Sequence, residues 1–363
     1  MNAYRAMRLL DRYLLKELGG ALLFAAGIFT SLLLANHLFQ LARLIFQQGA
    51  QASVAIQLVL YRLPLLLTYS LPMSVLLATL LAFGRLSDRN EIAALRTSGI
   101  SLYRLAVPVL AIGAFMSLST FLITEGVVPG AEDRYRLIFF RELLKQEPRP
   151  QENVLFREEI DGIESMVFAR RFHPETEMME GVVVTQFREG RVFRVIEAAK
   201  AIYRKGQWEF ERGILYLLNA SGTVRSQFAR LRVNLPRSPE EVAIPAKDPS
   251  EMSVRELRLA IDVLRRSGQE FTRYLVEMHT KMATPVSAIV FAILAVPLGL
   301  RPHRSGPSIG LGLSIVVILL YYLLLSLSLS LGHGGRLPPF VAAWLPNMVM
   351  ALIGGWLLYR MER

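Results

Sequence analysis

Residues 84–101 hold the side chains whose types and spacing are best suited to binding a partner protein. Glu91 is followed by Ile92 and Leu95, which form a short apolar stripe, and it is preceded by Arg89. A short helix that carries one acid and an apolar stripe can dock into a groove of another protein. A basic connector between two membrane spans would have a similar composition. The residue pattern alone leaves both interpretations open.

A second group of residues combines positive charge with a position close to the ends of apolar runs. Guanidinium groups bind phosphate through paired hydrogen bonds, so such residues could hold the phosphates of a glycolipid. Arginines at these positions could equally anchor helices at the membrane surface. The candidates for lipid binding are His37, Arg43, Arg62, Arg134 and Arg136.

Three charged residues at the start of a later apolar run share one helical face. Arg273, Glu277 and Lys281 are spaced at i, i+4 and i+8. Residues four apart on a helix are neighbours, so we expect them to pair with one another at the membrane surface rather than form a binding site.

Catalytic chemistry finds no support in the sequence. The chain has no cysteine, and its five histidines lack the spacing of metal ligands. The phosphate-binding motif G-x-x-x-x-G-K is absent from the sequence, so it offers no recognisable site for ATP. The sequence therefore predicts a protein that is not an enzyme and that holds no cofactor or metal of its own.

Long apolar runs are the elements that must position these residues. Hydrophobic residues make up 53% of the chain, and the mean hydropathy is +0.37. About 20 apolar residues in a helix cross the hydrocarbon core of a bilayer. The sequence predicts six transmembrane helices, at residues 19–41, 58–83, 105–123, 282–300, 309–331 and 340–359.

The net charge of +11 is unevenly distributed along the chain. Residues 128–271 contain 24 Lys/Arg and 23 Asp/Glu, so nearly the whole positive excess flanks the apolar runs. This pattern is typical of membrane topology and contact with anionic lipid, and it argues against nucleic acid as a partner. The positive-inside rule places the arginine-rich loops and both termini in the cytoplasm. Residues 128–252 are therefore expected in the periplasm.

The segment between the third and fourth apolar runs changes to a strand-like pattern. Short runs of β-branched and aromatic residues are separated by turn signals such as Lys205-Gly206. They predict an all-β domain of the sandwich or jelly-roll type. Ser253 and Glu256 have the spacing of a capping box and predict a helix that ends near Gly268. The strand-like runs lie at 154–156, 166–168, 181–187, 191–195, 208–211 and 228–233.

The predicted fold class is a membrane α-helical protein with six transmembrane helices and an inserted periplasmic β-domain. Residues 1–127 hold the first three spans and the 84–101 segment. Residues 128–252 form the β-domain, and residues 253–363 form a connecting helix and the last three spans.

An ordered set of short segments resembles the LptF/LptG permease family of the lipopolysaccharide exporter. The set begins with Leu10-Asp11-Arg12-Tyr13 and includes residues 84–101. The resemblance covers both membrane halves and the position of the β-domain. The remaining matching segments lie at 274–285, 295–299, 335–339 and 344–347.

The resemblance implies the permease subunit of an ABC transporter in the bacterial inner membrane, which takes lipopolysaccharide from the outer leaflet. A jelly-roll β-domain would pass the lipid to a periplasmic bridge of the LptC/LptA type. The family pairs two permeases, as a heterodimer or homodimer, with their first and fifth spans at the gate. A shared LptB-type ATPase would use ATP and Mg. The acid of the family's coupling helix matches Glu91, with Ile92 and Leu95 as its apolar neighbours.

Two other functions remain open on the residues alone. A membrane scaffold could dock envelope partners through its β-domain without transporting anything. An intramembrane enzyme could act on lipids, although the missing catalytic residues disfavour this function. Binding of an ATPase that depends on residues 84–101 would separate a transporter from a scaffold.

Overall fold

The computed structural model describes two compact units. They are Met1–Glu132 together with Leu275–Arg363, called here the membrane unit, and Asp133–Tyr274, called the β unit. The residues described are 2–48, 51–140, 151–160, 163–188, 191–204, 206–219, 222–233, 235, 238–242, 247–266, 269–300 and 307–362.

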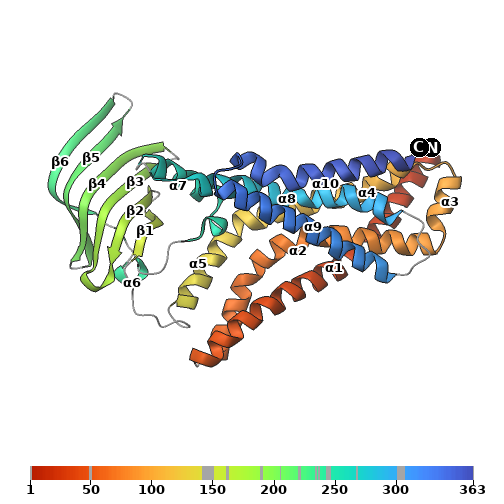
Figure 1. The fold of residues 1–363 in the computed structure, drawn as a ribbon, viewed down its shortest axis with the longest axis horizontal. Helices are drawn as coiled ribbons and strands as arrows, with labels where there is room; N and C mark the ends of the chain where they lie inside the picture. Colours follow the sequence, from red (N-terminus) through yellow and green to blue (C-terminus); the bar gives the residue numbers. More distant parts are fainter. Residues whose placement is uncertain are drawn as a thin grey trace. The chain divides into compact units, whose positions relative to one another are not determined.

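Among the described residues, six helices are long and apolar enough to cross a membrane, which confirms the six predicted spans (Figure 1). The six are α1 (Asn2–Gln48), α2 (Ala52–Asp88), α4 (Leu102–Gly126), α8 (Thr272–Gly299), α9 (Pro307–His333) and α10 (Pro339–Glu362). Five helices extend beyond both ends of the apolar run that predicted them, and α8 begins ten residues before its run and ends one residue before the end of that run.

Helices α2 and α8 form the centre of the membrane unit. Of their apolar spans, 78% and 67% are buried, whereas the other four spans are 22–33% buried. Small residues let the outer helices approach this centre closely. A Cβ atom added at Gly113 of α4 would lie 2.8 Å from the Cβ atom of Ala292 in α8, and one at Gly354 of α10 would lie 3.0 Å from the Leu294 backbone. Such close approach is typical of helix packing in membranes.

A buried polar contact joins the last three spans. The Tyr321 hydroxyl donates to the Asn347 side-chain oxygen at 3.0 Å, and the Asn347 amide donates to the Ala283 carbonyl at 2.7 Å. Because hydrocarbon offers no hydrogen-bond partners, a satisfied contact of this kind fixes the helices relative to one another.

The β unit contains one antiparallel sheet whose six strands follow one another in chain order. Each predicted strand run falls within a strand of the structure. The strands are β1 (Gln151–Ile160), β2 (Ile163–His173), β3 (Met178–Arg188), β4 (Arg191–Arg204), β5 (Gln207–Asn219) and β6 (Gly222–Val233).

The structure confirms an inserted β-domain, but its topology differs from the predicted sandwich or jelly roll. Every described strand pairs with its neighbour in sequence, so the sheet is a meander without the crossovers of a jelly roll. One face of the sheet carries the core of the unit, with Trp208, Phe210 and Phe172 fully buried.

Two helices flank the sheet in sequence, α5 (Val128–Ile138) and α7 (Val254–Arg266). The predicted capping box is formed at the start of α7. The Ser253 amide donates to the Glu256 carboxylate at 2.6 Å, and the Glu256 amide donates to the Ser253 hydroxyl at 3.1 Å. The backbone amides of Ser253 and Glu256, two of the donors at this helix end, are therefore paired.

Candidate functional site

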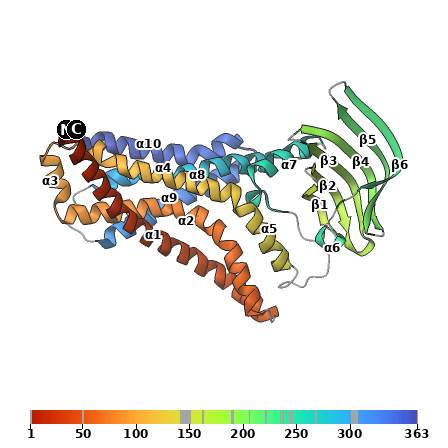
Figure 2. The same cartoon turned by 180° about the vertical axis from the view of Figure 1, so that it is seen from behind.

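The 84–101 segment folds into a short helix, α3 (Glu91–Thr97), between α2 and α4. Both views place it beside the beginning of α1 and the end of α10 (Figures 1 and 2). The helix is shorter than the predicted 84–101, since residues up to Asp88 belong to α2. Asn90 separates the two helices. Its φ is 57°, a left-handed conformation that asparagine tolerates.

A glycine motif ends α3. Gly99 has φ of 85°, its amide donates to the Arg96 carbonyl, and the Ile100 amide donates to the Leu95 carbonyl. These two bonds define a Schellman motif, in which glycine adopts the left-handed turn without steric cost. Leu95 and Ile100 both pack against the core of the membrane unit, as is usual for this motif. The chain therefore fixes α3 at both of its ends.

Glu91 forms its contacts within the chain. Its carboxylate accepts a hydrogen bond of 2.7 Å from the Tyr13 hydroxyl of α1, and Arg89 lies 3.8 Å away. The Glu91 side chain remains 32% exposed, so it is also accessible from outside. Glu91 thus links α3 directly to α1.

Two ion pairs strengthen the connection between α1 and its neighbours at this end. Arg85 of α2 donates to Glu17 at 2.6 Å, and Arg104 of α4 donates to Asp11 at 2.7 Å. Each pair is partly exposed, so each contributes at most about 1 kcal/mol. Together with the Tyr13–Glu91 bond, they join α1 to α2, α3 and α4.

The apolar stripe of α3 faces its own chain. Ile92 is 7% exposed and belongs to the core of the membrane unit, and Leu95 packs against the same core. The predicted docking of this stripe into a partner therefore needs revision, because the burial of Ile92 leaves it little surface to offer. The exposed residues of the segment are Asp88, Arg89, Asn90, Ala93, Ala94, Arg96, Thr97, Ser98, Gly99 and Ser101.

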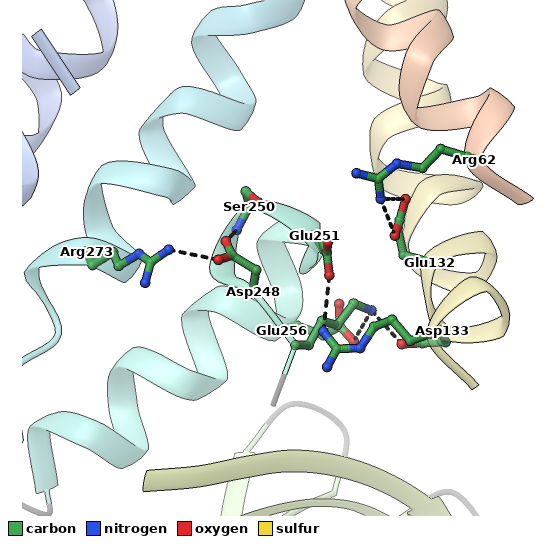
Figure 3. A network of polar contacts seen from close by, with 10 residues as sticks. Arg62, Glu132, Asp133, Asp248, Ser250, Glu251, Glu256 and Arg273 are labelled. Atoms are coloured by element: carbon green, nitrogen blue, oxygen red, sulfur yellow. Dashed lines mark hydrogen bonds and ion pairs between the residues drawn. The ribbon is translucent and has the colours of Figure 1, made fainter. Parts of the chain in front are cut away.

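Among the predicted lipid-binding residues, Arg62 already has an acidic partner. One nitrogen of its guanidinium group contacts both carboxylate oxygens of Glu132 at 2.8 Å, and Glu132 is fully buried (Figure 3). His37 is also buried in the membrane unit. A phosphate that bound Arg62 would therefore have to compete with Glu132.

The other predicted lipid-binding residues differ in their surroundings. Arg136 pairs at 3.2 Å with Glu251, the acid that is labelled in Figure 3. Arg134 is exposed on α5. Arg43 lies in α1, but its side chain is outside the part of the chain that the structure describes.

The structure records further partners for two of the three charged residues that were expected to pair with one another, Arg273, Glu277 and Lys281. Arg273 pairs with Asp248 at 2.8 Å, and Glu277 lies 3.2 Å from His333. Burial alone would raise the pKa of Asp248, but hydrogen bonds from Ser250 and Arg273 outweigh it and hold the pKa below its ordinary value.

Sequence reasoning missed the partners of these charged residues. Asp11, Tyr13, Glu17, Glu132 and Glu251 all lie far along the chain from the side chains they contact. One signal was present for Asp11 and Glu17. These two acids lie among the basic residues that precede a membrane span, and a carboxylate there is well placed to pair with an arginine.

The chain is similar to known proteins along almost its whole length. The profile of the family described as "Lipopolysaccharide export system permease LptF/LptG" matches residues 12–360. The LptG permease protein of Escherichia coli strain K12 is 25% identical over 302 residues, which cover 80% of this chain and 81% of that protein. The LptG permease protein of Haemophilus influenzae is 23% identical over 294 residues, with the same coverage. The chain belongs to the LptF/LptG family of lipopolysaccharide export permeases.

Proposed function

We propose that this chain is the permease subunit of an ATP-driven exporter that extracts lipopolysaccharide from the outer leaflet of the inner membrane and passes it to a periplasmic bridge. Its family supports a role in lipopolysaccharide export, and its six apolar helices support a multi-pass inner-membrane protein. ATP and Mg would be bound by a separate LptB-type ATPase. A second LptF/LptG-type permease would complete the membrane part.

In this proposal both termini and α3 lie in the cytoplasm, and the β unit lies in the periplasm. The distribution of arginines between the loops supports this orientation. The outward residues of α3 and the accessible part of Glu91 would contact the ATPase. The buried Ile92 would act instead as the anchor that holds α3 on the membrane unit.

The single observation that carries the proposal is the hydrogen bond between Tyr13 and Glu91. A force applied to α3 would reach α1 through this bond and through the core that buries Ile92, while two ion pairs join α1 to α2 and α4 nearby. Helix α1 presents a large apolar surface, including Leu23, Phe24 and Phe39. Movement of α1 would open or narrow the space in which acyl chains are held.

The phosphates of the lipid would contact basic residues near the other end of the spans. Arg134 is exposed and Arg43 remains a candidate. For Arg62 and Arg136, binding would replace the carboxylates of Glu132 and Glu251 by phosphate oxygens. Arginine can make this exchange, since phosphate and carboxylate present similar acceptors.

The test uses the chain co-expressed with its ATPase and a partner permease. Glu91→Ala should weaken ATPase association about tenfold or more, because truncation leaves a partner charge unpaired, at a cost of roughly 2–5 kcal/mol. Tyr13→Phe should leave association intact and lower the lipid released per ATP hydrolysed. Asp88→Ala is the control, since it removes an exposed acid of the same segment that forms no ion pair with the described residues.

Normal association and normal lipid release in Glu91→Ala would contradict the role of α3. A wild-type chain that binds the envelope partners but no ATPase would instead favour the scaffold function.

A further inference from the structure

The end of β3 and the beginning of β4 bring three arginines together in the β unit. Arg188 is the last residue of β3 and lies directly opposite Arg191, the first residue of β4. Arg194 follows three residues later. Like charges placed opposite each other across two strands destabilise a sheet unless something compensates them. This group is called the hairpin arginines below.

A bulge places an aromatic ring among the hairpin arginines. The register pairs Phe187 with Val192 and Gln186 with Arg194, so Phe193 has no residue opposite it on β3. Bulges turn a side chain in a new direction. The guanidinium carbon of Arg188 lies 4.7 Å from the centroid of the Phe193 ring, and that of Arg194 lies 5.8 Å from the same centroid. Two cations therefore share one aromatic ring.

Neutral groups hold Arg194 in place. Its Nε donates to the side-chain oxygen of Gln186, and the Gln186 amide donates to the Ser165 hydroxyl at 3.0 Å. Gln186 and Ser165 are both buried. The guanidinium group is thus oriented by a fixed pair of side chains, and its two terminal nitrogens remain as donors for a ligand.

The charge of the hairpin arginines is uncompensated within the described part of the chain. No carboxylate there forms an ion pair with Arg188, Arg191 or Arg194, whereas Arg157 and Arg255 of the same unit both pair with Glu164. Burial first, and then the nearby charge of Arg188, lower the pKa of Arg194. Both effects disfavour the positive form of Arg194, and the negative charge of a bound anion would offset them.

We propose that the hairpin arginines form a binding site for a phosphate monoester, with Arg188 and Arg194 as its main ligands and Phe193 as its floor. Guanidinium groups donate paired hydrogen bonds to phosphate oxygens, and two of them beside a ring fit one tetrahedral anion. The anion is assigned to a phosphate of the lipopolysaccharide headgroup, an assignment that rests on the proposed function. The site would hold the headgroup while the lipid passes the β unit.

The experiment measures binding and amide hydrogen exchange of residues 178–204 in the purified full-length protein in detergent. The probes are lipopolysaccharide, the same lipopolysaccharide after enzymatic dephosphorylation, and inorganic phosphate at matched ionic strength. Lipopolysaccharide should slow exchange in the hairpin, its dephosphorylated form should not, and inorganic phosphate should compete.

Two variants test the residues. Arg188→Gln combined with Arg194→Gln should reduce the protection at least tenfold, and Arg188→Gln alone, at an exposed strand end, should reduce it while leaving the sheet intact. Arg225→Gln is the control, because Arg225 is exposed on β6 and is not a member of the hairpin arginines.

Three results would overturn the proposal. Equal protection by the dephosphorylated lipid would exclude recognition of phosphate, and protection by inorganic phosphate alone would exclude the headgroup. Absence of protection by every probe would exclude the site. If the wild-type protein released no lipid on ATP hydrolysis but lipopolysaccharide still slowed hydrogen exchange in the hairpin, the export mechanism proposed above would be refuted and this site would remain.

Discussion

Acidic side chains determine which basic residues of this chain are available to a ligand. Arg62 and Arg136 were predicted to bind lipid phosphate, yet each contacts a carboxylate of its own unit. Each such contact satisfies the charge of an arginine and raises the cost of moving it to a ligand. The hairpin arginines have no such acidic partner among the described residues, and for this reason they are the better candidates in the β unit.

The buried pair of Arg62 and Glu132 gives a test of this view at the residue scale. Glu132→Gln removes the buried carboxylate that contacts Arg62, so the membrane unit should lose about 3 kcal/mol of stability. Thermal unfolding in detergent would measure the loss. The double variant Arg62→Met with Glu132→Leu should be far less destabilised, and equal losses in both variants would contradict the assignment of a tight pair.

Asp248 should make the stability of the β unit depend on pH. Its folded pKa lies below its ordinary value, despite its burial, because Ser250 and Arg273 donate to the carboxylate. The stabilisation is therefore present above the unfolded pKa of about 3.9 and is lost as the pH falls through the folded value. The difference in unfolding temperature between wild type and Asp248→Asn should be largest near pH 7 and shrink towards pH 3. A difference independent of pH would count against this account.

The sequence predicted individual residues better than their contacts. Glu91 was identified from the apolar stripe beside it and from the family resemblance, but its bond to Tyr13 joins residues 78 positions apart. The inward direction of Ile92 could not be deduced, since periodicity shows that an apolar stripe exists and not which surface covers it. Phe193 and the hairpin arginines depend on a bulge, which the strand-like alternation of the sequence does not reveal.

At the scale of elements, the two ends of α3 depend on residues that permit left-handed backbone. Gly99→Ala should destabilise the helix end by about 1 kcal/mol, because its φ of 85° is unfavourable for alanine. Gly84→Ala is a matched control. Gly84 lies inside α2 with open space around it, so alanine there should stabilise the chain by up to about 1 kcal/mol. The two variants should therefore change the unfolding temperature in opposite directions. Changes in the same direction would contradict the glycine motif at the end of α3.

Local signals predicted most of the elements. The apolar runs, the six strand-like runs and the capping box at Ser253 all report interactions between residues close in sequence, and all are found. The order of the strands within the sheet is a long-range property. Turn signals fit a meander and a jelly roll equally well, so the predicted topology differed from the one observed.

At the scale of the whole molecule, the proposed orientation can be tested with introduced cysteines, since the sequence contains none. Cysteine at Ser226, exposed on β6, should react with a membrane-impermeant maleimide in intact spheroplasts. Cysteine at Ser98, exposed after α3, should react only after the membrane is opened. Labelling of the Ser98 position in intact spheroplasts would reverse the orientation and remove α3 from the ATPase.

If the chain acts as proposed, ATP hydrolysis drives lipopolysaccharide out of the membrane through it. The most direct measurement reconstitutes the chain with its partner permease and ATPase in proteoliposomes and follows transfer of labelled lipopolysaccharide to a soluble bridge protein. Wild type should transfer lipid only with ATP and Mg, and Glu91→Ala should hydrolyse ATP without matching transfer or fail to bind the ATPase. Transfer that is independent of ATP, or equal transfer by Glu91→Ala, would contradict the account.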